Sequence, residues 1–172
     1  MKLMSVVASG VVVGLAVSFG WAESGKTVLK ATGSVPVVGA VMLQDTTGGL
    51  KIDADITQAP AGDHAFHIHE FGLCDDQGKA AGSHYNPAAH PHGNALKDGI
   101  AKTHAGDFGS ITIDASGKGS LHAVVPGLAL SKGDASVAGR AFILHEKVDD
   151  YSQPTGNAGS RIGCGPILIT GK

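Results

Sequence analysis

The chain has few aromatic and few charged residues. Aromatic side chains make up 5% of its 172 residues and charged side chains 16%. A net charge of −2 argues against the basic surface that nucleic-acid binding requires. Neither a GxGxxG nor a GxxxxGKS/T motif occurs, so no phosphate-binding loop is indicated.

Long hydrophobic runs are scarce, and the clearest one lies near the N-terminus. Lys2 precedes an apolar stretch from Val6 to Phe19, and small residues flank Trp21. This pattern predicts a signal peptide, residues 1–22, cleaved after Ala22, with export to the periplasm or the extracellular space. An uncleaved membrane anchor is the alternative, but the run is short and rich in glycine and serine. Loss of Lys2 changes the net charge from −2 to −3.

Cysteine is also rare, because the chain contains only Cys74 and Cys164. An even number of cysteines in an exported protein predicts one disulfide. The alternative is two unpaired buried thiols, which are uncommon outside the cytosol.

Glycine, in contrast, is abundant, with 26 residues between short apolar runs. This distribution favours one all-β domain, residues 23–172. The predicted strands are Thr27–Gly33, Pro36–Leu43, Leu50–Ile56, Ala65–His69, Phe108–Asp114, Gly119–Val125, Ala138–His145 and Pro166–Thr170. Together they indicate an antiparallel sandwich or flattened barrel. Two long loops, 70–107 and 146–165, interrupt the strands, and loops of that length are usually functional.

Histidine is frequent, with nine residues in the chain. His67 and His69 lie two apart on a predicted strand, so their side chains leave the same face. His145 ends another predicted strand. Copper(II) favours imidazole-rich sites, which these three residues and one more histidine would complete.

A second set of donors lies in or beside the first loop. His84, His92, His104 and Asp107 offer three nitrogens and one oxygen, which suits a closed tetrahedral zinc site. Each histidine alone would be interpreted as a solvated loop residue. Six imidazoles and a carboxylate together exceed what one tetrahedral ion needs and predict two metals.

Several segments resemble the copper/zinc superoxide dismutases, in particular exported bacterial members. They are Ala65–Gly72 (AFHIHEFG), Ala81–Pro87 (AGSHYNP), His104–Asp107 (HAGD), Gly139–Lys147 (GRAFILHEK) and Gly156–Gly165 (GNAGSRIGCG). The resemblance covers essentially the whole chain after the signal. It implies an eight-stranded Greek-key barrel of the immunoglobulin-like sandwich type with two long functional loops.

The resemblance also implies roles for individual residues. Copper would be held by His67, His69, His84 and His145, and zinc by His84, His92, His104 and Asp107, with one ion of each per chain. His84 would be shared as an imidazolate, Asp149 would hydrogen-bond His67 and His92, and Cys74 would pair with Cys164. The implied enzyme dismutates superoxide to oxygen and hydrogen peroxide while copper cycles between Cu(II) and Cu(I). His84 and Arg161 would be the catalytic residues, and Arg161 would guide the substrate. Because the net charge repels an anion, this guidance needs a local positive funnel.

The sequence departs from the family pattern in its loops. The second loop is shorter than in the animal cytosolic enzymes, and Asp150–Thr155 replaces their lysine-containing guiding segment, although Thr155 keeps a channel position. Extra residues separate His92 from His104. His90 and His92 both lie near the zinc position, and His92 is chosen because a glycine follows it. No role is assigned to His64 or His122, which we expect to be surface or hydrogen-bonded sheet residues.

Two other functions fit parts of this pattern. One is an exported copper/zinc carrier on the same barrel, and the other is a structural sandwich with metal-stabilised loops. The combination of Arg161, Asp149 and both cysteines favours the enzyme. No nucleic-acid partner is expected, nor membrane association after signal cleavage. A homodimer is left open because the family's dimer surface varies.

Overall fold

The computed structural model describes residues 22–171. Its elements are β1 (Ser24–Ala31), β2 (Val38–Thr46), β3 (Gly49–Gln58), β4 (Gly62–His69), the 3-10 helix η1 (Lys79–Ala81), α1 (Ala95–Asp98), β5 (Asp107–Ile113), β6 (Gly119–Val125), β7 (Ala141–His145), β8 (Arg161–Pro166) and β9 (Leu168–Gly171). The predicted signal peptide lies outside the described residues, apart from Ala22. In the described part of the chain, no helix has the length and hydrophobicity of a membrane span.

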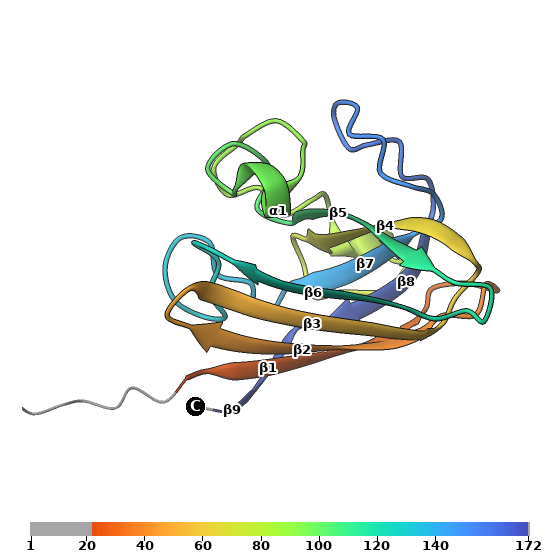
Figure 1. Cartoon of the computed structure of the whole chain (residues 1–172), viewed down its shortest axis with the longest axis horizontal. Coiled ribbons are helices and arrows are strands. Elements are labelled where there is room, and N and C mark those ends of the chain that lie inside the picture. Colours follow the sequence, from red (N-terminus) through yellow and green to blue (C-terminus); the bar gives the residue numbers. More distant parts are fainter. Residues whose placement is uncertain (1–21, 172) are drawn as a thin grey trace, which may run out of the picture.

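The strands form one antiparallel sheet that curves into a nearly closed barrel (Figure 1). Their order is β5-β4-β7-β8-β1-β2-β3-β6, and β9 pairs with β1 beside β8. The strands at the two ends of this order, β5 and β6, also contact each other. The predicted eight-stranded all-β barrel is therefore confirmed, with β9 as a short addition.

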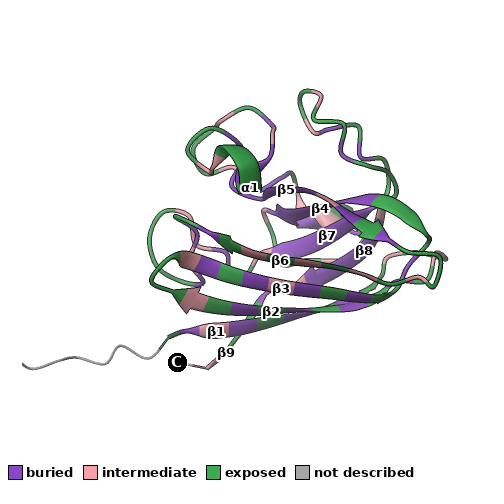
Figure 2. Cartoon of the chain, viewed as in Figure 1, coloured by how far each residue is buried: buried purple, intermediate pink, exposed green. Residues whose placement is uncertain are grey.

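Alternating side chains explain why β2 and β3 form as they do. Leu50, Ile52, Ala54 and Ile56 are buried, whereas Lys51 and Asp55 between them face solvent. Figure 2 shows the same alternation of buried and exposed positions along both strands. A period of two places one face of the sheet against the core and leaves the other in water.

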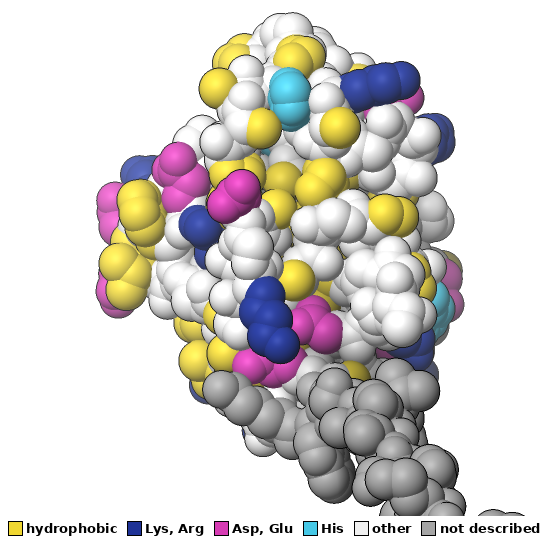
Figure 3. All heavy atoms as spheres, turned by 90° about the vertical axis from the view of Figure 1, so that its left-hand side faces the viewer, with side chains coloured by type: hydrophobic (Ala, Val, Ile, Leu, Met, Phe, Trp, Pro, Cys, Tyr) yellow, Lys and Arg dark blue, Asp and Glu magenta, His cyan; other side chains and the backbone are white. Residues whose placement is uncertain are grey.

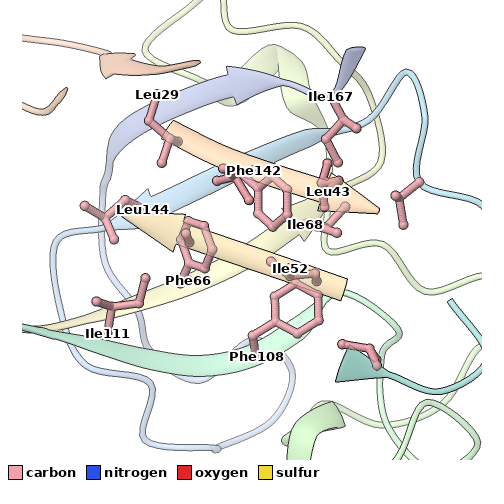
Figure 4. Close-up of a cluster of buried hydrophobic side chains, with 14 of the residues drawn as sticks. Leu29, Leu43, Ile52, Phe66, Ile68, Phe108, Ile111, Phe142, Leu144 and Ile167 are labelled. Carbon is pink, nitrogen blue, oxygen red and sulfur yellow. The ribbon is translucent and has the colours of Figure 1, made fainter. Parts of the chain in front are cut away.

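The core fills the inside of the barrel and is built around phenylalanines (Figure 4). The rings of Phe66 and Phe142 stack with centroids 5.0 Å apart, and Phe108 lies 6.2 Å from Phe142. Leu29, Leu43 and other fully buried aliphatic side chains surround them. Each large buried side chain contributes about 1.5–3 kcal/mol through loss of apolar contact with water.

Strand β4 is buried on both faces from His64 to its end, and β7 along its whole length. On β4, Phe66 and Ile68 point into the core, and His67 and His69 occupy the alternate positions. The two long loops cover this second face, and Figure 1 shows them on the same side of the sheet as β4 and β5. The fold thus places these histidines under the loops. His67 and His69 share one face of the strand, as the sequence predicted.

One predicted element was wrong. The segment 161–165 was expected to continue the second loop, but it forms most of β8 between β7 and β1. The glycines that suggested a loop are required by close packing: a Cβ at Gly163 would lie 2.7 Å from Val37, and one at Gly165 would lie 2.5 Å from the Val28 carbonyl oxygen. The predicted strand at 166–170 is split between the end of β8 and β9.

Candidate metal centre

Four histidines converge beside β4 and β7. His67 and His69 belong to β4, and His145 ends β7. His84 is brought to the group by an isolated antiparallel β-bridge between its backbone and that of His69. Antiparallel pairing places His67 opposite Ile143 and His69 opposite Ala141, which brings the end of β7 close to the pair. One ring nitrogen from each histidine lies within 4.8 Å of the others. These are the four residues that the sequence predicted for copper.

The hydrogen bonds of this group define its tautomers. Nδ1 of His69 donates to the Gly82 carbonyl at 3.0 Å, and Nδ1 of His145 donates to the Gly159 carbonyl at 3.4 Å. Burial, followed by the charges of neighbouring histidines, lowers the pKa of both His69 and His145. A neutral imidazole carries a single proton, so the Nε2 atom of each ring presents a lone pair to the centre of the group.

A second group of four residues adjoins the first and contains the donors that the sequence predicted for zinc. Asp107 is its centre: its carboxylate lies 2.8 Å from His84 Nδ1, 2.5 Å from His92 Nδ1 and 3.0 Å from His104 Nδ1. Burial acts to raise the pKa of Asp107, but the three histidines outweigh it and hold the pKa well below its usual range. The group therefore contains a fully ionised carboxylate among three ring nitrogens.

His84 belongs to both groups. Its ring centroid is 4.2 Å from that of His67 on one side and 5.5 Å from that of His104 on the other. Burial lowers its pKa to about 4, and the hydrogen bond to Asp107 only partly opposes this effect. The ring is therefore neutral near pH 7 and presents a nitrogen to each group.

Asp149 connects the two groups through hydrogen bonds to one histidine of each. Nε2 of His67 and Nε2 of His92 each donate to its carboxylate at 2.9 Å. Because Asp149 holds the Nε2 proton of each ring, Nδ1 is the atom that each ring has left to bind a metal. These two atoms and His104 Nδ1 are buried without a hydrogen-bond partner. Buried polar atoms are normally paired, so the unpaired His67 Nδ1 fits a metal in the first group, and the unpaired Nδ1 atoms of His92 and His104 beside Asp107 fit a metal in the second.

The two donor sets fit copper and zinc. The first consists of imidazoles alone, which suit copper, and the second combines three imidazoles with a carboxylate in the manner of a closed zinc site.

A cavity of about 720 Å³ opens onto the first group. His69, His84 and His145 line it, and Lys147 and Arg161 contribute positive charge. The Arg161 guanidinium donates to the carbonyls of Gly78 and Gly82 at 2.6 Å each, which fixes its direction. On the face that Figure 3 shows, basic and acidic side chains are interspersed, without a broad field of one sign.

The Cys74–Cys164 disulfide is present, as predicted. It joins the first loop to β8, and a small cluster of Ala81, Ala141 and Ile143 packs around Cys164. Gly78, which binds Arg161, also donates its N–H to the Cys74 carbonyl. Two hydrogen bonds of Gly78 thus connect Cys74 of the disulfide to the guanidinium.

The remaining histidines lie apart from the two groups. His64 is buried between the carbonyls of His145 and Pro60, and His122 is exposed beside Asp53. His90 lies outside the donor groups found among the described residues, whereas its neighbour His92 lies inside one. Asp150 is exposed and bonds to loop atoms, and Thr155 lines the cavity.

The chain was compared with known proteins. A family model described as copper/zinc superoxide dismutase matches residues 37–167. The chain belongs to the copper/zinc superoxide dismutase family. Its barrel and its two histidine-rich groups agree with that membership.

Individual relatives support the same assignment. An extracellular Cu-Zn superoxide dismutase of Caenorhabditis elegans is 39% identical over 144 residues, which span 78% of this chain and 63% of that protein. Cu-Zn superoxide dismutase A of Xenopus laevis is 37% identical over 150 residues, 83% of this chain and 96% of that protein. The crystal structure of the clock protein EA4 superposes with a TM-score of 0.76 at 30% identity, covering 91% of this chain and 100% of that one.

The sequence did not single out every residue near the site. Lys147 and Asp150 line the cavity, and Tyr151 and Gln153 contact His92. The alternate spacing of Asp149, Tyr151 and Gln153 was a usable signal, but nothing in the sequence indicated that the segment faces a histidine of the first loop.

Proposed function

We propose that this chain dismutates superoxide in the cavity beside Arg161, with copper in the first histidine group and zinc in the second. The family membership and the donor sets support superoxide as substrate and both metals as cofactors. Copper supplies the one-electron redox chemistry, and zinc has no redox role. The net reaction converts two superoxide anions and two protons to oxygen and hydrogen peroxide.

The chain's own residues attract the substrate and handle protons. Burial lowers the pKa of Arg161 from its very high ordinary value, and the group stays a cation near neutral pH. With Lys147 it draws an anion into the cavity, where field focusing raises the rate of encounter; superoxide dismutase is a standard example of this effect. His84 lines the same cavity, and we propose that it binds and releases a proton during turnover.

The observation that carries this proposal is the shared position of His84. One imidazole belongs to both donor groups and also lines the cavity that Arg161 borders. A metal carrier would need neither a shared ring nor a cation held at the cavity wall. His84 is neutral near pH 7, so one nitrogen already carries a lone pair and only one proton must leave before the ring can bind a metal through each nitrogen.

The decisive experiment uses the purified chain from residue 23 reconstituted with copper and zinc. We expect comparable amounts of the two metals and rapid superoxide consumption. Protein loaded with zinc alone should consume none, because zinc cannot change oxidation state. Binding of both metals without superoxide consumption would instead support the carrier function.

We also propose that the protein is exported after cleavage at Ala22 and acts in a bacterial periplasm or outside the cell. The printed name of the nematode relative describes an extracellular enzyme, which is compatible with export. Mass spectrometry of protein secreted from its own host would identify the first residue. A homodimer stays a prediction, and light scattering of the mature chain would test it.

A further inference from the structure

Three alternate residues of the second loop converge on one histidine of the first loop. Asp149 accepts a hydrogen bond from His92 Nε2 at 2.9 Å. The Tyr151 ring lies nearly parallel to the His92 ring, with an interplanar angle of 24° and centroids 6.5 Å apart. Gln153 accepts from the His92 backbone N–H at 3.0 Å and donates to the His92 carbonyl at 2.9 Å. The ring edge, the ring face and the backbone of His92 are each contacted.

Two of the three contacts, those of Asp149 and Tyr151, are linked to each other. The Tyr151 N–H donates to the same Asp149 oxygen that accepts from His92. Tyr151 has a φ of +59°, a conformation that costs free energy for a residue with a side chain. The intervening Asp150 has different partners: its carboxylate accepts from the Ser152 N–H and the Asn157 amide.

The extra segment between His92 and His104 completes the arrangement. Asn94 caps α1 by accepting from the Leu96 N–H at 3.0 Å, and its amide donates to the Tyr151 hydroxyl at 3.0 Å. The close approach depends on Gly109, where a Cβ would lie 2.8 Å from the Tyr151 hydroxyl and 2.9 Å from the Asn94 amide. One side chain thus ties the helix that follows His92 to the loop that contacts His92.

We propose that Tyr151, held by Asn94, and Gln153 are positioning residues that fix His92 in the second metal group and slow the release of zinc. This inference rests on the proposed zinc role of His92. The carboxylate of Asp149 holds the Nε2 proton, which leaves Nδ1, beside the Asp107 carboxylate, as the atom that would bind zinc. The Gln153 amide fixes the backbone, and the Tyr151 ring shields the imidazole face from which water would reach it.

The physical effect follows from what must move when zinc leaves. Release of a buried ion requires His92 to rotate or its backbone to shift. Here a backbone shift breaks both Gln153 hydrogen bonds, and a ring rotation breaks the Asp149 bond and displaces the Tyr151 ring. Residues that support metal ligands in this way typically change metal affinity by about 10–100-fold. Because Tyr151 and Gln153 are exposed, substituting them leaves the hydrophobic core intact.

The test measures zinc release from the fully metal-loaded protein into an excess of a chromogenic chelator. Gln153→Ala should release zinc about tenfold faster than the unchanged protein. Tyr151→Phe and Asn94→Ser remove the same hydrogen bond from opposite sides, and serine still caps the helix. Each should accelerate release, and the double variant should be no faster than the quicker single one. Leu96→Gln, an exposed change on the same helix, is the control and should release zinc at the original rate.

A second measurement separates positioning from general loosening. Cobalt(II) at the zinc position has a visible spectrum that depends on ligand geometry. Gln153→Ala and Tyr151→Phe should alter this spectrum at temperatures far below unfolding, and Leu96→Gln should not. Unchanged zinc release and an unchanged cobalt spectrum in Gln153→Ala, Tyr151→Phe and Asn94→Ser would overturn the proposal and leave the proposed function intact. Failure of the unchanged protein to retain zinc would overturn both.

Discussion

The Nε2 atom of His69 lies 3.2 Å from the Nε2 atom of His145, although the two residues are 76 positions apart in the sequence. Each ring gives its proton to a backbone carbonyl, and burial keeps both rings neutral. Two lone pairs facing each other in a buried site repel, and a cation between them removes that repulsion. This pair is the clearest structural indication of the first metal position.

Replacing one member of the pair should remove copper. We expect His145→Ala to lose most bound copper and to reduce superoxide consumption by several orders of magnitude, because one of four donors is gone. Metal analysis together with a superoxide assay measures both effects. His122→Ala, at an exposed histidine bonded to Asp53, is the matched control and should behave as the unchanged protein. Full activity in His145→Ala would refute the assignment.

Arg161 should affect the rate of superoxide consumption through its positive charge and through the fixed orientation of its guanidinium. In Arg161→Ala the rate should fall only partly, and its decrease with added salt should become weaker, since screening then acts on a smaller positive field. Arg161→Lys keeps the charge but cannot bond the carbonyls of Gly78 and Gly82 in the same way, so its rate should lie between the two. Rates measured across ionic strengths test this, and identical curves for all three proteins would contradict it.

Opening the disulfide should weaken both the fold and the site. The bond closes a loop with a sequence separation of 90, and removing such a bond typically costs about 2–5 kcal/mol of stability. Gly78 bonds to both Cys74 and Arg161, so the guanidinium should also lose its fixed direction. We expect Cys74→Ala with Cys164→Ala to unfold at lower denaturant concentration and to consume superoxide more slowly. Thiol titration under non-reducing conditions should find no free thiol in the unchanged chain.

Zinc binding should release a proton near neutral pH. Burial lowers the pKa of His92, but its hydrogen bonds to Asp107 and Asp149 outweigh this and raise the pKa to about 9 from 6.5 in the metal-free protein. Zinc must displace that proton, so apparent zinc affinity should rise with pH up to about 9. Calorimetric titrations in buffers of different ionisation enthalpy measure the released proton. Asp149→Asn should move the dependence to lower pH.

The raised pKa of His92 also predicts how the stability of the metal-free protein changes with pH. Because the pKa of His92 is higher in the folded state than in the unfolded state, its stabilising contribution is complete below about pH 6.5 and is lost as the pH rises through about 9. Metal-free protein should therefore unfold more easily at pH 9 than at pH 6.5. Equal denaturation midpoints at the two values would count against the ionised His92–Asp107 pair.

Local periodicity was sufficient to predict much of the barrel. The alternation from Leu50 to Ile56 and the shared face of His67 and His69 follow from the period of a strand, whatever surrounds it. Strand β8 could not be predicted in this way, because Gly163 and Gly165 are selected by contacts with Val37 and Val28 that lie more than a hundred residues away.

The donor residues could be named from the sequence, but their chemistry could not. Whether His67 binds through Nδ1 or Nε2 depends on the position of Asp149, and that position is set by how the second loop folds over β4. The contacts of Tyr151 and Gln153 with His92 depend on the same folding. Sequence spacing within a loop does not determine which side chain of another loop it meets.

The glycines of β8 have a consequence for protein engineering. Arg161 and Cys164 lie on the same short strand as Gly163 and Gly165, and side chains added at those glycines would collide with neighbouring strands. Mutational libraries that aim to widen substrate access should therefore leave 161–166 untouched and diversify exposed positions at the cavity rim, such as Val148 and Asn157.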